Sequence, residues 1–178
     1  NGKSTVTALT GHILLKAGLD YHIGGNIGKA VMSLPYHRKG YVFEVSSFQI
    51  ELLTNIDAKI SVITNITPDH LDRYKNVEEY AQVKQKILIP NSLKIIGINS
   101  HISQNIYYNL KKAYSSKLIP ISNSNQIEGG IFCDNNYLYD NTENDKIRLS
   151  LPALPHLQGV HNKENIAIAY AICKSLSV

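Results

Sequence analysis

Apolar residues along this chain switch between helical spacing and short continuous runs. Helical spacing, with apolar residues three and four positions apart, covers residues 5–17, 78–88 and 162–176. The short runs between these segments are rich in Val and Ile and predict strands. Strands interleaved with helices in this way favour a parallel sheet with helices on its faces. We expect strands at 41–47, 58–66, 93–100 and 117–122, and further helices at 48–53 and 101–114.

Two stretches depart from this alternation. Residues 19–28 contain Gly24-Gly25 and predict a glycine-rich loop. Residues 126–152 hold short β runs separated by Gly-Gly, Asp-Asn-Asn and Asp-Asn, which predict antiparallel hairpins. The predicted fold class is therefore α/β, with a mostly parallel sheet flanked by helices and a small antiparallel β appendage. We interpret residues 1–178 as a single domain.

The composition narrows the class of protein without indicating its chemistry. Apolar residues make up 43% of the chain, as in globular domains, and no apolar run approaches the roughly 20 residues of a membrane-spanning helix. The net charge of +4 is spread along the chain, which argues against a nucleic-acid surface and weakly favours small anionic ligands. Two cysteines are too few for a disulfide scaffold, so we expect a cytoplasmic protein without a membrane or nucleic-acid partner.

The chain begins with Asn1-Gly2-Lys3-Ser4-Thr5, directly before a predicted helix. This pentapeptide matches the second half of a phosphate-binding loop, G-x-x-x-x-G-K-[ST]. In such loops the backbone N–H groups and the lysine bind phosphate oxygens, and the hydroxyl after the lysine coordinates Mg²⁺. The residues indicate an ATP site in a fold like that of P-loop NTPases. The alternative is a chance tetrapeptide at the start of a helix.

Polar and charged residues interrupt or follow the next two predicted strands. Glu44 lies within the apolar run 41–47, where a carboxylate is costly unless it is paired or binds a metal ion. It can complete a Mg²⁺ site, or it can face solvent on an edge strand. Strand 58–66 runs into Thr67–Tyr74, where His70 lies near two aspartates and an arginine. Since ligands bind at the carboxyl ends of parallel strands, His70 is a candidate metal or phosphate contact, with a structural histidine as the alternative.

Three further polar residues lie in predicted helices, and their spacing alone does not assign them a role. Lys84 lies in helix 78–88, where a solvated face, as for Lys86, is the simplest interpretation. Asn162 and Asn165 begin the last helix. Asn162 can cap this helix, or the two residues can contact the adenine or ribose of a nucleotide.

In combination, these motifs resemble the central domain of the Mur ligase family of ATP-dependent amide ligases. They occur in the family order across nearly the whole chain. The glycine-rich segment, Phe48-Gln49 and Arg73-Tyr74 are similar to the ligases that add D-glutamate to UDP-N-acetylmuramoyl-L-alanine. The matching stretches are Asn1–Thr5, Gly24–Gly28, Glu44–Glu51, Asn65–Tyr74, Tyr80–Lys84 and Gly159–Asn165.

The resemblance implies a reaction and a role for each matching residue. The family transfers the γ-phosphoryl group of ATP to a substrate carboxylate, and the amine of the incoming amino acid then displaces phosphate. By resemblance, Lys3 contacts the β- and γ-phosphates together with the rest of the loop Asn1–Thr5. One Mg²⁺ would be held by Ser4 and Glu44, and a second by His70 and an N-carboxylated Lys84. The remaining implied roles are substrate contacts at Asn26 and Ser46 and nucleotide contacts at Asn162 and Asn165.

The resemblance also implies parts that this chain lacks. A UDP-binding domain would precede residues 1–178 and an amino-acid-binding domain would follow them, so the isolated central domain would supply ATP and Mg²⁺ binding without ligation. Alternatives are another ligase of this family, a folylpolyglutamate synthase-like enzyme and a non-catalytic nucleotide-binding module. A P-loop NTPase switch is a further alternative, but the chain contains no guanine-selective N-K-x-D motif.

Overall fold

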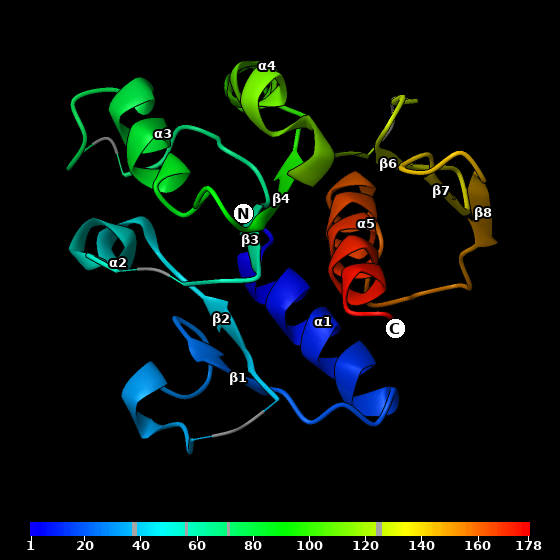
Figure 1. Cartoon of the computed structure of the whole chain (residues 1–178), viewed down its shortest axis with the longest axis horizontal. Coiled ribbons are helices and arrows are strands. Elements are labelled where there is room, and N and C mark those ends of the chain that lie inside the picture. The colour runs from blue at the N-terminus through cyan, green and yellow to red at the C-terminus, as the bar shows by residue number, and fades with distance from the viewer. Residues whose placement is uncertain (37–38, 56, 71, 124–125) are drawn as a thin grey trace.

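A computed structural model describes the chain as an α/β fold built on a six-stranded sheet (Figure 1). From β3 to β6 neighbouring strands are parallel, and β7 and β8 then continue the same sheet in antiparallel orientation. The expected fold class is confirmed, although the antiparallel strands extend the main sheet instead of forming a separate appendage. The strands, in spatial order, are β3 (Ile60–Ile63), β4 (Leu93–Gly97), β5 (Leu118–Ser122), β6 (Ile131–Asp134), β7 (Tyr137–Asp140) and β8 (Ile147–Ser150). The structure describes residues 1–36, 39–55, 57–70, 72–123 and 126–178, so Leu71 of the Thr67–Tyr74 motif lies outside it.

A second, two-stranded parallel sheet consists of β1 (His22–Gly25) and β2 (Tyr41–Glu44). Within the described part of the chain, β2 forms no ladder with β3. The prediction of a glycine-rich loop over 19–28 was therefore wrong for His22–Gly25, which form β1. The glycines serve the strand because a Cβ at Gly24 would lie 2.6 Å from the Lys29 carbonyl oxygen, too close for any side chain.

Helices cover both faces of the six-stranded sheet. Adjacent residues of β4 show the two faces, because Ile95 packs toward α1 (Lys3–Lys16) and α5 (Val160–Ser175), whereas Ile96 packs toward α3 (Val77–Gln85) and α4 (His101–Tyr114). This alternation follows from the period of two along a strand. The remaining helical segments are α2 (Ser47–Leu52) and the 3-10 turns Val31–Ser33 and Ser115–Lys117. No helix in the described ranges is long and apolar enough to cross a membrane.

The buried face of α1 contains small and polar residues besides its apolar ones. Val6 and Leu14 are buried as the helical pattern indicates, but so are Thr7, Thr10 and Gly11. A Cβ at Gly11 would lie 1.9 Å from Cδ1 of Ile23, so β1 approaches this side of the helix closely. Apolar spacing alone therefore does not determine which side of α1 is buried. The close packing of β1 and α5 also buries small and polar residues of the helix.

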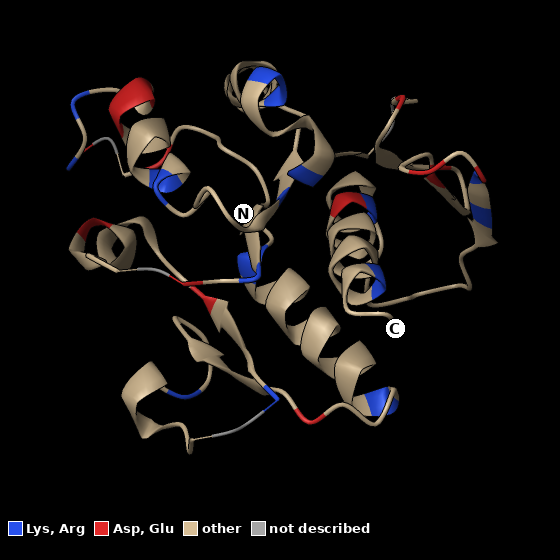
Figure 2. Cartoon of the chain, viewed as in Figure 1, with Lys and Arg blue, Asp and Glu red and all other residues tan. Residues whose placement is uncertain are grey.

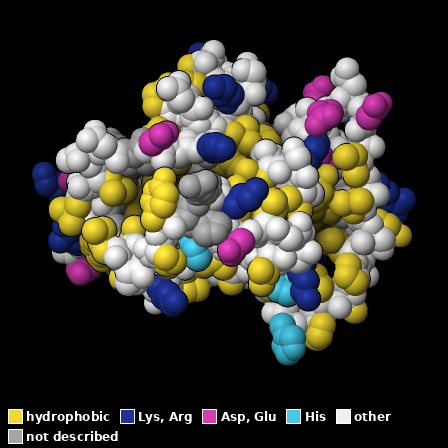
Figure 3. All heavy atoms as spheres, turned by 60° about the horizontal axis from the view of Figure 1, so that its bottom comes forward, with side chains coloured by type: hydrophobic (Ala, Val, Ile, Leu, Met, Phe, Trp, Pro, Cys, Tyr) yellow, Lys and Arg dark blue, Asp and Glu magenta, His cyan; other side chains and the backbone are white. Residues whose placement is uncertain are grey.

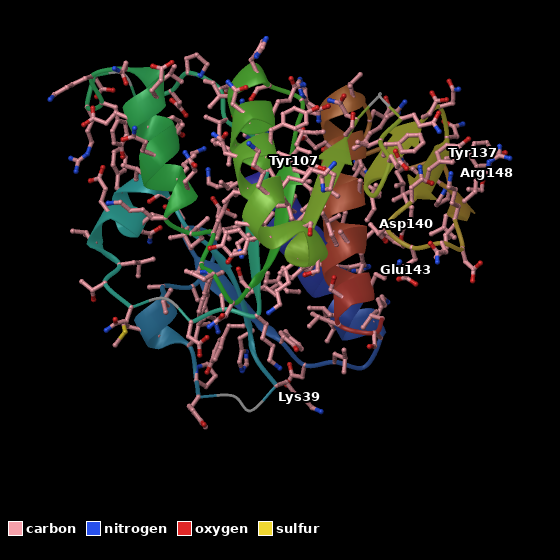
Figure 4. The ribbon with its side chains drawn as sticks, turned by 45° about the horizontal axis from the view of Figure 1, so that its top comes forward. Lys39, Tyr107, Tyr137, Asp140, Glu143 and Arg148 are labelled. Atoms are coloured by element: carbon pink, nitrogen blue, oxygen red, sulfur yellow. The ribbon has the colours of Figure 1, made fainter. Side chains whose placement is uncertain are left out.

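The antiparallel edge of the sheet is joined to α5 through Asp140 at the end of β7 (Figure 4). The Asp140 carboxylate is fully buried and accepts hydrogen bonds from Lys174 Nζ at 2.7 Å and Tyr170 Oη at 3.0 Å. Burial opposes ionisation of Asp140, but these bonds and those from Thr142 outweigh it, and its pKa lies below the usual value. Near the same edge, the Arg148 guanidinium lies 3.7 Å from the ring centroid of Tyr137 (Figure 4).

Charge is distributed over the surface without a continuous basic region on the side seen in Figure 3. Lysine and arginine side chains on this side are separated from one another by hydrophobic and uncharged ones (Figure 3). The net charge of +4 is thus dispersed over this face.

Candidate functional site

The start of α1 is fixed to the carboxyl end of β3. Thr64 Oγ1 and Asn65 Nδ2 each donate a hydrogen bond of 2.9 Å to the Asn1 carbonyl oxygen, and the Asn1 amino group donates to Asn65 Oδ1 at 3.1 Å. Charged residues of both signs lie near this start of α1 (Figure 2). The segment Asn1–Thr5 is therefore held at the edge of the sheet where ligands of parallel α/β folds bind.

Gly2 is the N-cap of α1 and adopts a left-handed backbone conformation with φ of 82°. A Cβ at Gly2 would lie 2.3 Å from Asn165 Oδ1, so a larger residue would collide with α5 as well as strain the backbone. The first turn of α1 has no acidic residue and no side-chain cap. Its free N–H groups and Lys3 therefore form a region that favours an anion.

Glu44 is the last residue of β2 and is buried, with 5% of its surface exposed. Asn26 Nδ2 donates to Glu44 Oε1 at 3.4 Å, whereas the buried Oε2 has no hydrogen-bond partner among the described residues. The alternative interpretation, in which Glu44 faces solvent, is wrong. A buried carboxylate oxygen without a partner is costly, and a cation is the kind of ligand that would satisfy it.

His70 and Lys84 both lie near the buried ring of Tyr80. Lys84 Nζ is 4.6 Å from the Tyr80 ring centroid, and the His70 ring centroid is 6.2 Å from it. Lys84 Nζ also donates to the Asn65 carbonyl oxygen at 3.4 Å, which brings it close to the anchor of Asn1. Lys84 is not on a solvated face like Lys86, so that interpretation is wrong.

The protonation of Lys84 reflects this environment. Burial, together with the nearby charge of Lys3, lowers the pKa of Lys84 to about 8. Near neutral pH the ammonium form of Lys84 still predominates, but the neutral amine is more populated than in an ordinary surface lysine.

A Mg²⁺ site at these residues would be an open one. The described ranges contain no group of three or more His, Cys, Asp and Glu side chains that could enclose a metal ion. Mg²⁺ is commonly held by one or two carboxylates, waters and the phosphates of a nucleotide, and the unpaired Oε2 of Glu44 fits that mode.

Asn26 and Ser46 both lie close to Glu44, Asn26 through a hydrogen bond and Ser46 two residues further along the chain. The Asn26 backbone N–H donates to the Glu44 carbonyl oxygen at 2.8 Å. Ser46 is the N-cap of α2, and its Oγ accepts the Gln49 N–H at 3.3 Å in a reciprocal capping box. The expected contact of Asn26 and Ser46 with a substrate stays a prediction, since the Ser46 hydroxyl already has a local structural role.

Asn162 does not cap α5. The helix begins at Val160 with Gly159 as N-cap, and Asn162 Nδ2 donates to the Gln158 carbonyl oxygen at 2.8 Å inside the first turn. Asn162 Oδ1 in turn accepts from Asn165 Nδ2 at 3.0 Å. Asn162 thus orients the buried Asn165 toward Gly2, and a nucleotide contact by either asparagine stays a prediction.

Sequence reasoning missed Glu164, which is 3% exposed and lies next to Asn165 in α5. Burial raises its pKa to about 7, against the lowering effect of a hydrogen bond from the Asn99 amide. The signal was present, because Glu164 lies three and four residues before Ala167 and Ile168 on the apolar face of the helix. A carboxylate in such a position requires an explanation.

Comparison with known sequences settles the family. A sequence model of the Mur ligase middle domain matches residues 1–173. The chain belongs to this family. Among Mur ligases, the UDP-N-acetylmuramoylalanine--D-glutamate ligase of Rickettsia bellii is 44% identical and covers 100% of this chain and 40% of that protein. The ligases of the same name from Rickettsia prowazekii and a Chelativorans species are 41% and 40% identical, over 100% and 97% of this chain. The chain spans about 40% of the length of these relatives.

Solved Mur ligase structures share the fold. The MurF ligase of Thermotoga maritima, in complex with ADP, superposes with a TM-score of 0.66 at 12% identity, over 99% of this chain and 44% of that one. The UDP-N-acetylmuramate:L-alanyl-gamma-D-glutamyl-meso-diaminopimelate ligase of Neisseria meningitides gives 0.67 at 15% identity, over 100% and 60% of the two chains. At these identities the likeness establishes the fold of this Mur ligase domain.

Proposed function

We propose that this chain is the central, ATP- and Mg²⁺-binding domain of a ligase that adds D-glutamate to UDP-N-acetylmuramoyl-L-alanine in peptidoglycan precursor synthesis. Relatives that carry this activity in their names cover 97 to 100% of the chain at 40 to 44% identity. The observation that carries the proposal is the joining of Asn1–Gly2 to Thr64, Asn65 and Asn165. This arrangement puts an anion-binding helix start at the ligand edge of the sheet.

The reaction begins with attack of the substrate carboxylate oxygen on the γ-phosphorus of ATP. A new C–O–P linkage forms, the bond to the β-phosphate oxygen breaks, and ADP leaves. The amine of D-glutamate then attacks the acyl carbon and loses a proton, and inorganic phosphate leaves to give the amide. Two anions must approach each other in the first step, so positive groups must offset their repulsion.

In this proposal, Lys3 and the backbone N–H groups of the loop Asn1–Thr5 bind and orient the triphosphate. Ser4 and Glu44 would hold one Mg²⁺, and His70 with Lys84 would hold a second. The metal ions would neutralise charge on the phosphates and the reacting carboxylate. Support for these roles comes from the unpaired Oε2 of Glu44 and from the position of His70 and Lys84 around one ring.

Lys84 would act as a carbamate, because an ammonium group would repel Mg²⁺ whereas a carbamate offers two anionic oxygens. The neutral amine attacks CO₂, an N–C bond forms, and one proton passes to solvent. The lowered pKa of Lys84, about 8, favours the neutral amine that this step requires.

The rest of the proposed enzyme lies outside this chain. Asn26 and Ser46 would contact the muramoyl-alanine end, Asn162 and Asn165 the nucleotide. Flanking domains would bind the UDP group and D-glutamate. ATP as a substrate agrees with the cytoplasmic location that we expect for this protein.

The test is titration of ATP and Mg²⁺ into the full-length protein by calorimetry, followed by a ligation assay with D-glutamate. Lys3→Ala should abolish ligation and weaken ATP binding at least about a hundredfold while leaving the circular dichroism spectrum unchanged. Lys16→Ala, at the exposed far end of α1, is the matched control and should behave as wild type. Normal ligation by Lys3→Ala would remove the basis for the phosphate-loop assignment.

A further inference from the structure

Glu164 is a buried carboxyl group for which the proposed mechanism has no use. Its side chain is 3% exposed, and Oε1 has no hydrogen-bond partner among the described residues. It lies one residue before Asn165, whose amide contacts Gly2 in the phosphate loop. The carboxyl group is therefore an unsatisfied polar group directly behind the proposed phosphate site.

Two oxygen atoms crowd the same side of Gly97 at the end of β4. A Cβ at Gly97 would lie 1.9 Å from the Thr64 carbonyl oxygen and 2.1 Å from Glu164 Oε1. Thr64 also holds the Asn1 carbonyl oxygen through its own hydroxyl. A proton on Glu164 would reduce the repulsion between two such acceptor oxygens, so this crowding favours the protonated form of Glu164.

Asn99 limits the other side of the carboxyl group. Asn99 Oδ1 accepts hydrogen bonds of 3.2 Å from Ser122 Oγ and from the Asn123 backbone N–H. Its oxygen is thereby turned to the end of β5, which leaves its amino group for Glu164. Glu164 thus connects the carboxyl ends of β3, β4 and β5 behind the start of α1.

Few charges near Glu164 compensate its ionisation. Burial is the main influence on the Glu164 carboxyl group, and it raises the Glu164 pKa to about 7. Cys133 on β6 stays neutral because burial raises its pKa to about 11. The titratable groups on the elements packed against α5 are Lys3, His12 and Lys16 of α1, Lys94 of β4, and Cys133 and Asp134 of β6.

We propose that Glu164 is a positioning residue that couples nucleotide binding to its own protonation. The protonated carboxyl ties Thr64, and through it the phosphate loop, to α5 and adds no charge near the phosphates. The ionised carboxylate loses the bond to Thr64 and repels the phosphates. Nucleotide binding above neutral pH therefore takes up one proton from solvent at Glu164. This inference rests on the proposed nucleotide binding by Asn1–Thr5.

The experiment measures the dissociation constant of ADP for the full-length protein between pH 6.0 and 8.5 at fixed Mg²⁺. Wild type is compared with Glu164→Gln, which keeps the shape of the side chain and is neutral at every pH. The ratio of the wild-type to the variant dissociation constant should rise with pH, by up to about tenfold per pH unit above the pKa. Titration of Lys84 and of the nucleotide is common to both proteins and cancels in this ratio.

A residue with only a packing role would not give this pattern. At pH 8.5 the Gln variant should bind ADP more tightly than wild type, whereas a disrupted site would bind it more weakly at every pH. Glu143→Gln is the control, because Glu143 is an exposed carboxylate that pairs with Lys174 away from the loop, and its pH profile should match wild type.

A ratio that is constant across the pH range, or weaker binding by the Gln variant at pH 8.5, would overturn the inference. If circular dichroism shows that the Gln variant is unfolded, Glu164→Asp replaces it. Its shorter carboxyl is withdrawn from Thr64, so its midpoint should move to lower pH, and an unchanged midpoint would also overturn the inference. Absence of ADP binding by wild type at every pH would instead overturn the proposed function on which the inference depends.

Discussion

Lys84 and Glu164 show how burial acts on single side chains near the start of α1. Desolvation disfavours the charged form of both, so it lowers the pKa of the lysine to about 8 and raises that of the glutamic acid to about 7. Near neutral pH the Glu164 carboxyl group is therefore partly protonated, and Lys84 has a larger neutral fraction than a surface lysine. The charge around the start of α1 therefore depends on the protonation of Lys84 and Glu164, and a highly charged ligand bound there can change that protonation.

Glu44→Gln tests the metal role of the unpaired carboxylate. The amide keeps the volume and the bond with Asn26 but removes the negative charge from Oε2, so Mg²⁺ should bind more weakly. We expect the Mg²⁺ concentration for half-maximal ligation by the full-length enzyme to rise about tenfold or more. A magnesium titration checks this, with the exposed Glu78→Gln as control. An unshifted titration would return Glu44 to a structural role.

Lys84→Ala tests the carbamate. The variant should lose ligation, because an anionic ligand to the metal is missing, and short carboxylic acids such as acetate should restore part of the rate. The measurement is the ligation rate against acetate concentration, with the exposed Lys86→Ala as an active control. A fully active Lys84→Ala enzyme is incompatible with the carbamate proposal.

At the residue scale, motifs of adjacent residues could be predicted from the sequence, whereas contacts between residues far apart in the chain could not. Asn1–Thr5 and Glu44 were identified because a short loop and a charge in an apolar strand are local signals. The contacts of Asn1 with Asn65, and of Gly2 with Asn165, join residues far apart in the chain. No spacing rule predicts them, since they depend on how the start of α1 packs against the end of β3 and against α5.

At the scale of elements, α3 carries Lys84 and begins with a well-formed cap. Asn76 Oδ1 accepts the Glu79 N–H at 2.8 Å, and Glu79 Oε2 accepts the Lys75 N–H at 2.7 Å. Side chains at the start of the helix therefore accept hydrogen bonds from backbone N–H groups both within its first turn and just before it. Its position determines where Tyr80 and Lys84 lie.

Asn76→Ala should reduce the free energy of unfolding by about 1 kcal/mol, because the Glu79 N–H loses its acceptor. Chemical denaturation of the chain measures the loss. The control is Asn109→Ala, an exposed position within α4, where alanine should cost nothing because it has the higher helix propensity. Equal free energies of unfolding for Asn76→Ala and wild type would show that the Asn76 cap does not stabilise the fold.

The helices and most strands of the fold followed from local pattern, and two features did not. β1 was interpreted as a loop because Gly24 and Gly25 have no β propensity, yet close approach of neighbouring chain requires glycine there. The lack of pairing between β2 and β3 was also not predicted. Both strands have ordinary apolar runs, and strand pairing is a property of the tertiary fold.

At the scale of the whole molecule, this chain covers about 40% of the length of its named relatives. In the proposed function, the substrates would meet through surfaces outside this chain. Approach of two reactants in a fixed orientation supplies a large part of such catalysis.

We therefore expect the 178-residue chain alone to form no amide from ATP, D-glutamate and UDP-N-acetylmuramoyl-L-alanine. Product detection by mass spectrometry checks this, with the full-length protein as positive control and a no-protein sample as background. Product above background from the chain alone would contradict the proposed division of labour.

The edge position of β3 has a consequence for the motions of the molecule. β3 pairs with β4 on one side only, whereas β4 and β5 are each paired on both sides. Amide protons that point away from β4 lack the protection of a ladder and exchange with solvent through smaller openings. Hydrogen–deuterium exchange should therefore be faster in Ile60–Ile63 than in Leu93–Gly97 and should slow when a nucleotide holds Asn1 against Thr64. The strand that anchors the phosphate loop would then report occupancy as a change in exchange rate, without a change of shape.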